Sequence, residues 1–177
     1  MNYYGAKELA ESFRTVRKNT IQVAEDIPEE KYSYRAAPDT MSVAEMLAHL
    51  ACTPHWAQQC FFVESKTTVS MEDFGRWMGE LGGQAKALTS KAQIVAALKA
   101  NGEAFAKQLD GLTEAQLAQP ITAPNATKST FEMLIGIKEH EMHHRAQLFL
   151  MERMVGIVPH LTRARMERMA QMAAAKN

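Results

Sequence analysis

The stretch Met133–Met151, MLIGIKEHEMHHRAQLFLM, decides how the fold of this chain is read. Apolar residues and two histidines follow one another in it at steps of four and three, which is the spacing of one face of an α-helix. We expect this helix to run from about Ser129 to Val155 and to end before Gly156 and Pro159, a common kind of stop. The positions on the face are Met133, Ile137, His140, His144, Leu148 and Met151.

The same spacing predicts three further long helices. The first carries an apolar stripe from Leu9 to Ile27 and stops at Pro28. The second begins at Ser42, because a serine followed three residues later by a glutamate is typical of a capping box. Pro54 is expected to kink that helix or to end its first half, since proline removes one backbone hydrogen bond. The third follows Ser90.

Between the second and third helices lies a long glycine-containing segment, residues 66–88, with weaker periodicity. We expect a crossover here, with a short helix around Met71–Leu81, and a partly extended connection at Pro120–Thr122. A last helix is predicted over about 161–175. The fold class is therefore all-α: a four-helix bundle with a long crossover between helices 2 and 3 and an extra C-terminal helix. We expect residues 1–177 to form a single domain with a core of about 8–159.

Composition excludes several classes of protein. Twenty Lys and Arg residues balance twenty Asp and Glu residues, so the chain lacks the strong basic field that nucleic-acid binding usually requires. No apolar run approaches the roughly 18–20 residues of a membrane span. The N-terminus has no apolar stretch typical of a secretory signal. We therefore expect a cytoplasmic protein that binds neither nucleic acid nor membrane.

The histidines suggest a metal site. His140 and His144 are separated by one helical turn, so that two imidazoles can reach one ion. His49 lies on the apolar face of the second helix, between Met46 and Leu50. Polar rings that face the interior of a bundle need partners, and one shared divalent cation would satisfy all three. The alternative is that each is an ordinary hydrogen-bonded core histidine. We interpret His55 and His160 as surface or loop residues.

A competing motif overlaps this pair. Residues His140 to His144 also fit H-E-x-x-H, the zinc protease signature in which the glutamate, here Glu141, acts as general base. That interpretation needs a third ligand downstream, for which Glu152 and Glu167 are the candidates. A protease of this kind usually lays its substrate along a sheet edge, and the sequence predicts no convincing sheet. The HExxH-type hydrolase is therefore the minor alternative.

Three segments together resemble the DinB/YfiT-like family of helical-bundle metalloproteins. They are residues 39–50, DTMSVAEMLAHL; residues 139–148, EHEMHHRAQL; and residues 154–159, MVGIVP. The resemblance covers about Glu8 to Pro159 and leaves the last helix as an addition. The family usually has tryptophan at the position of Met41 and often glycine at that of Ala146.

The resemblance implies a four-helix bundle that binds one divalent cation through His49, His140 and His144. It also implies a homodimer and, for some members, thiol S-transferase or isomerase activity with low-molecular-weight thiols. Three protein nitrogens leave at least one coordination position open, as in catalytic sites, and zinc or nickel suits imidazole ligands.

Three charged residues lie near the predicted ligands. Glu45 and Glu141 are candidates for holding a ligand ring or a bound water by a hydrogen bond. Arg145 is a candidate for contacting an anionic substrate group. The alternative is that all three are ordinary surface residues.

The function predicted from these observations is activation of a thiol or water for transfer to a small electrophile. The main alternative is a metal-binding or stress-response bundle without turnover. Whether the protein is an enzyme is left open by the sequence.

Overall fold

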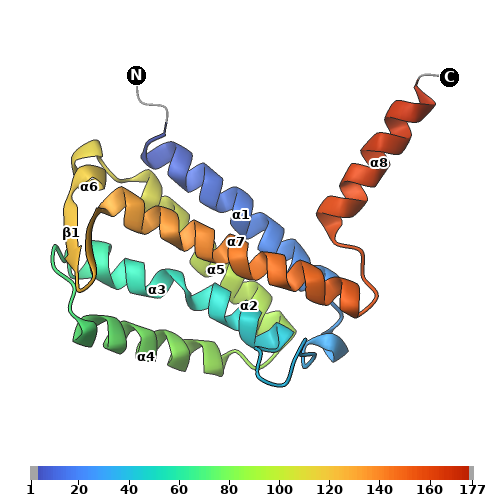
Figure 1. The fold of residues 1–177 in the computed structure, drawn as a ribbon, viewed down its shortest axis with the longest axis horizontal. Helices are drawn as coiled ribbons and strands as arrows, with labels where there is room; N and C mark the ends of the chain where they lie inside the picture. Colours follow the sequence, from blue (N-terminus) through green and yellow to red (C-terminus); the bar gives the residue numbers. More distant parts are fainter. Residues whose placement is uncertain (1–3, 176–177) are drawn as a thin grey trace.

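The computed structural model describes residues 4–175, and its helices form an all-α bundle (Figure 1). The bounds are α1 Ala6–Asp26, η1 Glu29–Lys31, α2 Val43–Cys52, α3 Pro54–Ala57, η2 Gln58–Val63, α4 Met71–Ala87, α5 Lys91–Asp110, α6 Glu114–Ala118, β1 Pro120–Ala123, β2 Ala126–Ser129, α7 Thr130–Met154 and α8 His160–Ala174.

Four helices close the bundle. α1 packs against α5 and α7, and α2 packs against the same two helices. α3 and the π-helical segment η2 continue the line of α2. The predicted four-helix bundle with an added C-terminal helix is confirmed. None of the helices in residues 4–175 is both long and apolar enough to cross a membrane.

Local sequence sets where these helices begin and end. The hydroxyls of Ser42, Ser90 and Ser129 each accept a hydrogen bond from the backbone N–H three residues later, as a capping box requires. At the other end of α7, Gly156 has a φ of 86°, a conformation that glycine adopts without a steric penalty. The predicted helix starts and the predicted stop of α7 are therefore confirmed.

The segment expected to be mostly crossover is more ordered than predicted. α4 is a 17-residue helix that packs along α2 and α3, outside the four-helix bundle (Figure 1). Its buried side chains are Trp77 and Leu81. Because this apolar face is short and glycines interrupt it, the sequence shows only weak helical periodicity here. The predicted extended connection is the hairpin β1–β2, with Pro120 paired to Ser129.

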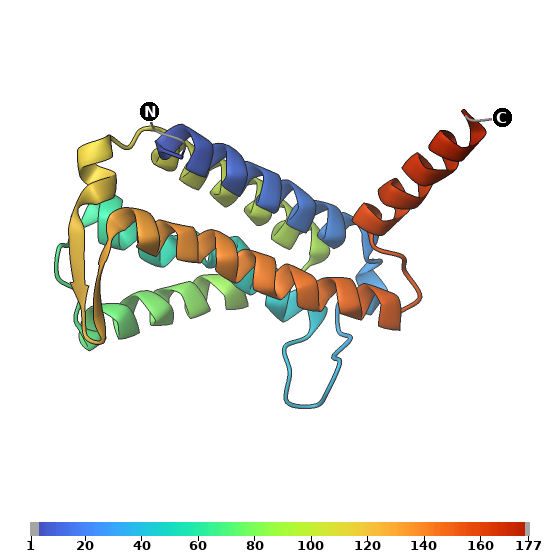
Figure 2. The same ribbon diagram turned by 45° about the horizontal axis from the view of Figure 1, so that its top comes forward.

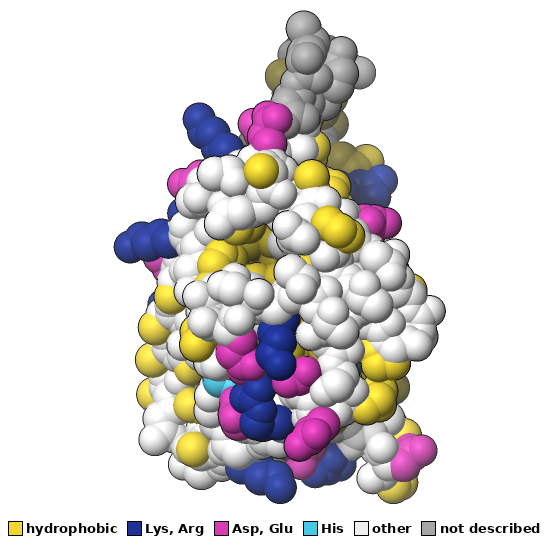
Figure 3. Space-filling view, turned by 90° about the vertical axis from the view of Figure 1, so that its left-hand side faces the viewer, with side chains coloured by type: hydrophobic (Ala, Val, Ile, Leu, Met, Phe, Trp, Pro, Cys, Tyr) yellow, Lys and Arg dark blue, Asp and Glu magenta, His cyan; other side chains and the backbone are white. Residues whose placement is uncertain are grey.

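The C-terminal helix α8 projects away from the bundle in both ribbon views (Figures 1 and 2). None of its described residues is buried. At the other end of the molecule, which carries α6 and the hairpin, basic and acidic side chains lie next to one another (Figure 3). This mixed surface agrees with the zero net charge of the chain.

The described core contains three apolar clusters, and a polar layer lies between the two larger ones. One of these two contains Val23, Leu98 and Leu148, and the other contains Phe13, Phe105 and Ile137. The third and smallest cluster includes Cys60, Trp77 and Ile121. Between the two larger clusters, on α1, lies Arg17, a buried residue on the apolar stripe. Gly102 of α5 makes room for it, because a Cβ at residue 102 would lie 2.7 Å from Arg17 Cγ.

Two glycine-to-alanine substitutions are predicted to have opposite effects. Gly83→Ala, in an exposed part of α4 with open space at the Cβ position, should stabilise the protein by up to about 1 kcal/mol, because alanine favours the helix. Gly102→Ala gains the same propensity but displaces Arg17, and should cost about 1–3 kcal/mol. Urea unfolding of both variants measures the difference. Equal stabilisation by both would contradict the packing described for Arg17.

Candidate metal centre

Three histidines from two adjacent helices converge on one point. His49 lies on α2, whereas His140 and His144 lie one turn apart on α7. The Nε2 atoms of His49 and His140 are 2.7 Å apart. One nitrogen from each of the three rings lies within 4.8 Å of the other two, and all three side chains are partly buried. These rings could hold a metal ion, and the structure brings together the three residues that the sequence analysis singled out.

Pro54 does not move His49 away from the other two rings. The backbone stays helical through Thr53, and Pro54 is the first residue of α3. Thr53 donates hydrogen bonds from both its backbone N–H and its hydroxyl to the carbonyl of His49, each at 2.8 Å. The turn that carries His49 is therefore complete before the proline interrupts the backbone hydrogen bonds.

The electrostatics of His49 and His140 favour neutral rings. Burial is the main cause that lowers the pKa of His49 to about 4, and the neighbouring His140 and His144 contribute to the same shift. The pKa of His140 is lowered by burial first and then by His144 and His143. A neutral imidazole keeps the nitrogen lone pair that a metal ion requires, so the cluster is suited to a cation at neutral pH.

Gln147 orients one ring of the cluster. Its Oε1 lies 2.7 Å from His144 Nδ1, so a proton on Nδ1 leaves Nε2 free as the acceptor. Gln147 belongs to the segment of residues 139–148 that carries the family resemblance, but no role was predicted for it. Its spacing of three residues from His144 on one helix was the available signal.

Behind the histidines lies a buried ion pair that the sequence analysis did not predict. Arg17 Nη2 and Nε donate to the Glu141 carboxylate, each at 2.9 Å, and the two side chains are 4% and 2% exposed. Glu141 is therefore a buried residue, not a solvated surface glutamate. It makes no hydrogen bond to a site histidine within residues 4–175.

The remaining contacts of Arg17 tie the site to the bundle. Its Nη1 donates to the carbonyl of Leu98, and its Nη2 donates to the carbonyl of Leu50 at 2.9 Å. The Leu50 carbonyl is the group that an N–H at residue 54 would have satisfied in a regular helix, and proline has no N–H. Arg17 thus supplies the hydrogen bond that Pro54 cannot.

These contacts rule out the catalytic role of Glu141 in the H-E-x-x-H motif. Its carboxylate points into the core and is held by Arg17, so it is not available as a general base. The third ring of the cluster comes from His49, upstream, rather than from a downstream glutamate. Glu152 is fully buried near the end of α7, where burial raises its pKa to about 7, and Glu167 is exposed on α8. Neither belongs to the cluster within the described residues.

Glu45 and Arg145 have partners other than the histidines. The carboxylate of Glu45 accepts from Arg35 and from the Ser42 backbone N–H, and these bonds lower its pKa to about 2. Arg145 donates to the carbonyl of Val16 and lies over the ring of Phe149. Neither side chain is hydrogen-bonded to a site histidine among residues 4–175. His160, expected at the surface, is partly buried against Phe149.

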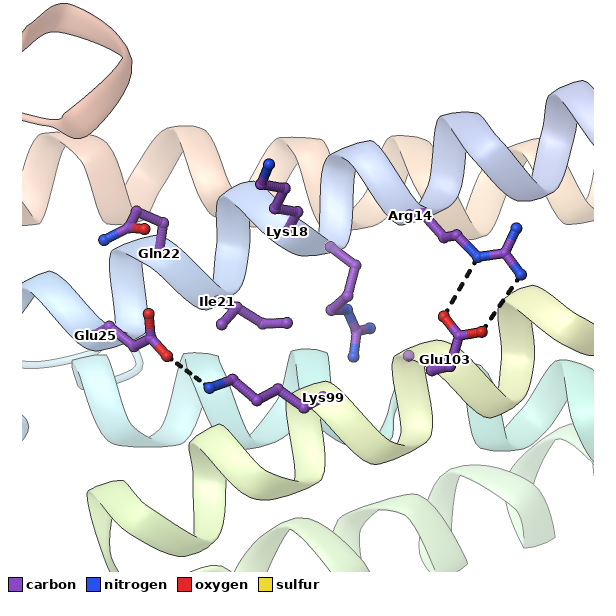
Figure 4. A pocket seen from close by; sticks show the side chains of 9 residues that line it. Arg14, Lys18, Ile21, Gln22, Glu25, Lys99 and Glu103 are labelled. Atoms are coloured by element: carbon purple, nitrogen blue, oxygen red, sulfur yellow. Dashed lines mark hydrogen bonds and ion pairs between the residues drawn. The ribbon is translucent and has the colours of Figure 1, made fainter. Parts of the chain in front are cut away.

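A cavity of about 340 Å³ opens beside the histidines. His49 and His140 form part of its wall, and the rest is mostly apolar, including Met78, Leu81 and Ile137. Another cavity, of about 480 Å³, lies between α1 and α5 and contains none of the site histidines (Figure 4). Ion pairs between Arg14 and Glu103 and between Lys99 and Glu25 bridge its two walls. Of these two cavities, the one lined by His49 and His140 gives a small molecule access to the candidate metal centre.

Comparisons with known proteins agree with this architecture. Residues 12–148, which include all three histidines, match the profile of the DinB superfamily. The uncharacterized protein YjoA of Bacillus subtilis is 27% identical over 154 residues, which are 85% of this chain and 91% of YjoA. The solved structure of YjoA, a DinB-like protein, gives a TM-score of 0.60 at 26% identity and covers 84% of this chain and 92% of its own.

Two more distant structures share the fold. A protein from Streptococcus pneumoniae gives a TM-score of 0.65 at 19% identity, with 86% of this chain and 93% of that chain covered. YfiT from Bacillus subtilis, described as a probable metal-dependent hydrolase with an unusual four-helix bundle topology, gives 0.66 at 15% identity, with 89% and 91% covered.

The buried ion pair yields a prediction about stability. Glu141→Leu leaves the Arg17 charge buried without its partner and should lower the free energy of unfolding by about 3–5 kcal/mol. Arg17→Met/Glu141→Leu removes both charges and should recover part of that loss, because the Leu50 carbonyl still loses the hydrogen bond that Arg17 donates. Urea unfolding gives the three values. The control is Glu103→Leu, which breaks the exposed pair with Arg14 and should cost less than about 1 kcal/mol. A similar cost for both single variants would contradict the role given to the buried pair.

Proposed function

Since the chain belongs to the DinB superfamily, we propose that it is a metal-dependent enzyme that activates a thiol or a water molecule for attack on a small electrophile. His49, His140 and His144 hold one divalent cation, with zinc or nickel as the expected ion. The observation that carries the proposal is the convergence of three imidazoles from two helices beside an open cavity, whose wall includes His49 and His140.

The donor set fits such an ion. Neutral imidazole nitrogens are common ligands of zinc and nickel, and three of them leave room for a further ligand on the side of the cavity. A cation held there lowers the pKa of a thiol or a water molecule and so provides a nucleophile at neutral pH. Gln147 fixes the ring of His144, and the Arg17–Glu141 pair fixes the spacing of α2 and α7 that the three ligands need.

The groups that line the cavity favour a thiol as the nucleophile. Hydrolysis usually requires a general base in addition to the cation, and Glu141 is held in the core. Glu132 is the carboxylate that lines the cavity among the described residues, and it is hydrogen-bonded to Ser129 at the start of α7. A thiol that loses its proton on binding the cation needs no such base. Water is the second nucleophile to test, in line with the description of YfiT as a probable metal-dependent hydrolase.

The metal site is tested by metal content. We expect purified protein to carry close to one zinc or nickel ion per chain, and His144→Ala to lose it because two imidazoles bind more weakly than three. Plasma mass spectrometry measures the content. His143→Ala is the matched control, since this exposed neighbour lies outside the cluster and should leave the content unchanged. Equal content in the wild type and in His49→Ala/His144→Ala would rule out the site.

The reaction is tested by turnover. We expect the metal-loaded protein to transfer a low-molecular-weight thiol to a chromogenic aryl halide, to lose this activity on treatment with a chelator, and to regain it with zinc or nickel. An aryl ester tests hydrolysis in parallel. If a chelator lowers the melting temperature strongly and no reaction is found with either substrate, the protein is a metal-binding bundle without turnover, and the proposed enzyme activity is wrong.

A further inference from the structure

A further cavity, distinct from the one between α1 and α5, adjoins the cavity at the metal centre and is called the second cavity below. It has a volume of about 520 Å³ and lies where α3, α4, the β1–β2 hairpin and α7 meet. Four side chains, those of Trp56, Phe74, Lys128 and Met133, line both cavities. The two spaces therefore share a wall, and a molecule that occupies the second cavity can extend toward His49 and His140.

The walls of the second cavity are mostly apolar and are open at the rim. Phe74 is 43% exposed and Met71 is 69% exposed, and both line the cavity. The indole of Trp77 is fully buried and donates its N–H to Glu64 at 2.9 Å. The polar group of this ring is thus already satisfied within the protein and requires no partner in the cavity. Large apolar side chains exposed around a concave site are typical of ligand-binding clefts.

One basic side chain, that of Lys128, lies at the shared wall. Lys128 is the charged residue among those that line the second cavity, and its side chain makes no hydrogen bond or ion pair within residues 4–175. Other basic residues at the same end of α4 are already paired, Lys66 with Asp73 and Arg76 with Glu64. Glu132, in the first turn of α7, is hydrogen-bonded to Ser129, and the charge of Lys128 is the smallest of the effects that lower its pKa. An anionic ligand group would therefore meet an ammonium that forms no ion pair with the described residues.

We propose that the two cavities form one binding site for an amphipathic carboxylate, that is, a small molecule with an apolar chain or ring and one anionic group. The apolar part lies between α4 and the hairpin, the carboxylate contacts Lys128, and the electrophilic end reaches the histidines. This assignment deepens the proposed function, because it describes the electrophile on which the activated nucleophile acts.

Tryptophan fluorescence tests the site directly, because Trp56 and Trp77 are the two tryptophans of the chain and both line the second cavity. The probes are octanoate, octanol and acetate, titrated into full-length protein. We expect octanoate to change the emission saturably, octanol to bind more weakly, and acetate to have no effect at the same concentrations.

Two variants separate the contributions of charge and apolar contact. Lys128→Ala should weaken octanoate binding about three- to tenfold, the range of one exposed charge-assisted contact, and leave octanol binding unchanged. Phe74→Ala should weaken both probes. Lys31→Ala, which changes an exposed lysine outside both cavities, should change neither. Circular dichroism checks that each variant is folded.

The outcome distinguishes this inference from the proposed function. Both are supported if octanoate binds and the metal is lost only in the histidine variants. If octanoate binds but the wild type holds no metal, the binding site stands and the metal chemistry fails. If octanoate causes no saturable change, or if Lys128→Ala and Phe74→Ala bind it as tightly as the wild type, the inference is overturned whatever the metal content. If sedimentation shows a dimer for the wild type and a monomer for Phe74→Ala, a second copy of the chain covers this rim, and the inference is also overturned.

Discussion

The ion pair between Arg17 and Glu141 is the constraint on which the arrangement of the bundle depends. A buried charge is tolerated only when it is paired and its hydrogen bonds are satisfied. Arg17 meets this condition by contacting three other helices, through Glu141 on α7, the Leu50 carbonyl on α2 and the Leu98 carbonyl on α5. These contacts separate the two larger apolar clusters of the core and fix how far apart α2 and α7 lie.

The same layer sets the geometry of the histidine cluster. His49 precedes Leu50, and His140 precedes Glu141, so each of these histidines is one residue from a group that Arg17 holds. Consecutive residues of a helix point about 100° apart. Glu141 can therefore point into the core while His140 points toward the cavity. One helix thus supplies both the charge that organises the bundle and two of the three rings that could hold a metal ion.

The helix α4 adds a further wall to a site whose histidines come from two helices. Without it, the face of α2 and α3 that carries His49 and Trp56 would be open to solvent. α4 packs along this face and contributes Phe74, Met78 and Leu81 to the cavity at the centre. It is also the element that the sequence indicated least clearly, because four glycines interrupt a helix with only two buried side chains.

The sequence by itself determined the features that depend on neighbours within one helix. The serine caps, the stop at Gly156 and the pairing of His140 with His144 all follow from local backbone geometry, which is the same in every helix. His49 was assigned to the same site because it lies on the apolar face of its helix, and the structure places it beside the other two rings. The cation itself, the homodimer and the cytoplasmic location stay predictions.

Only the tertiary structure decided which helices meet and what lies between them. Arg17 and Glu141 are 124 residues apart, and no local rule relates their positions. No role was predicted for Arg17, and Glu141 was considered as a general base or as a partner of a ligand ring, not as the partner of a buried arginine. The cavities likewise arise where α3, α4, the hairpin and α7 come together. Such features depend on packing between distant segments, and a helical repeat shows which face of a helix is buried but not which partner buries it.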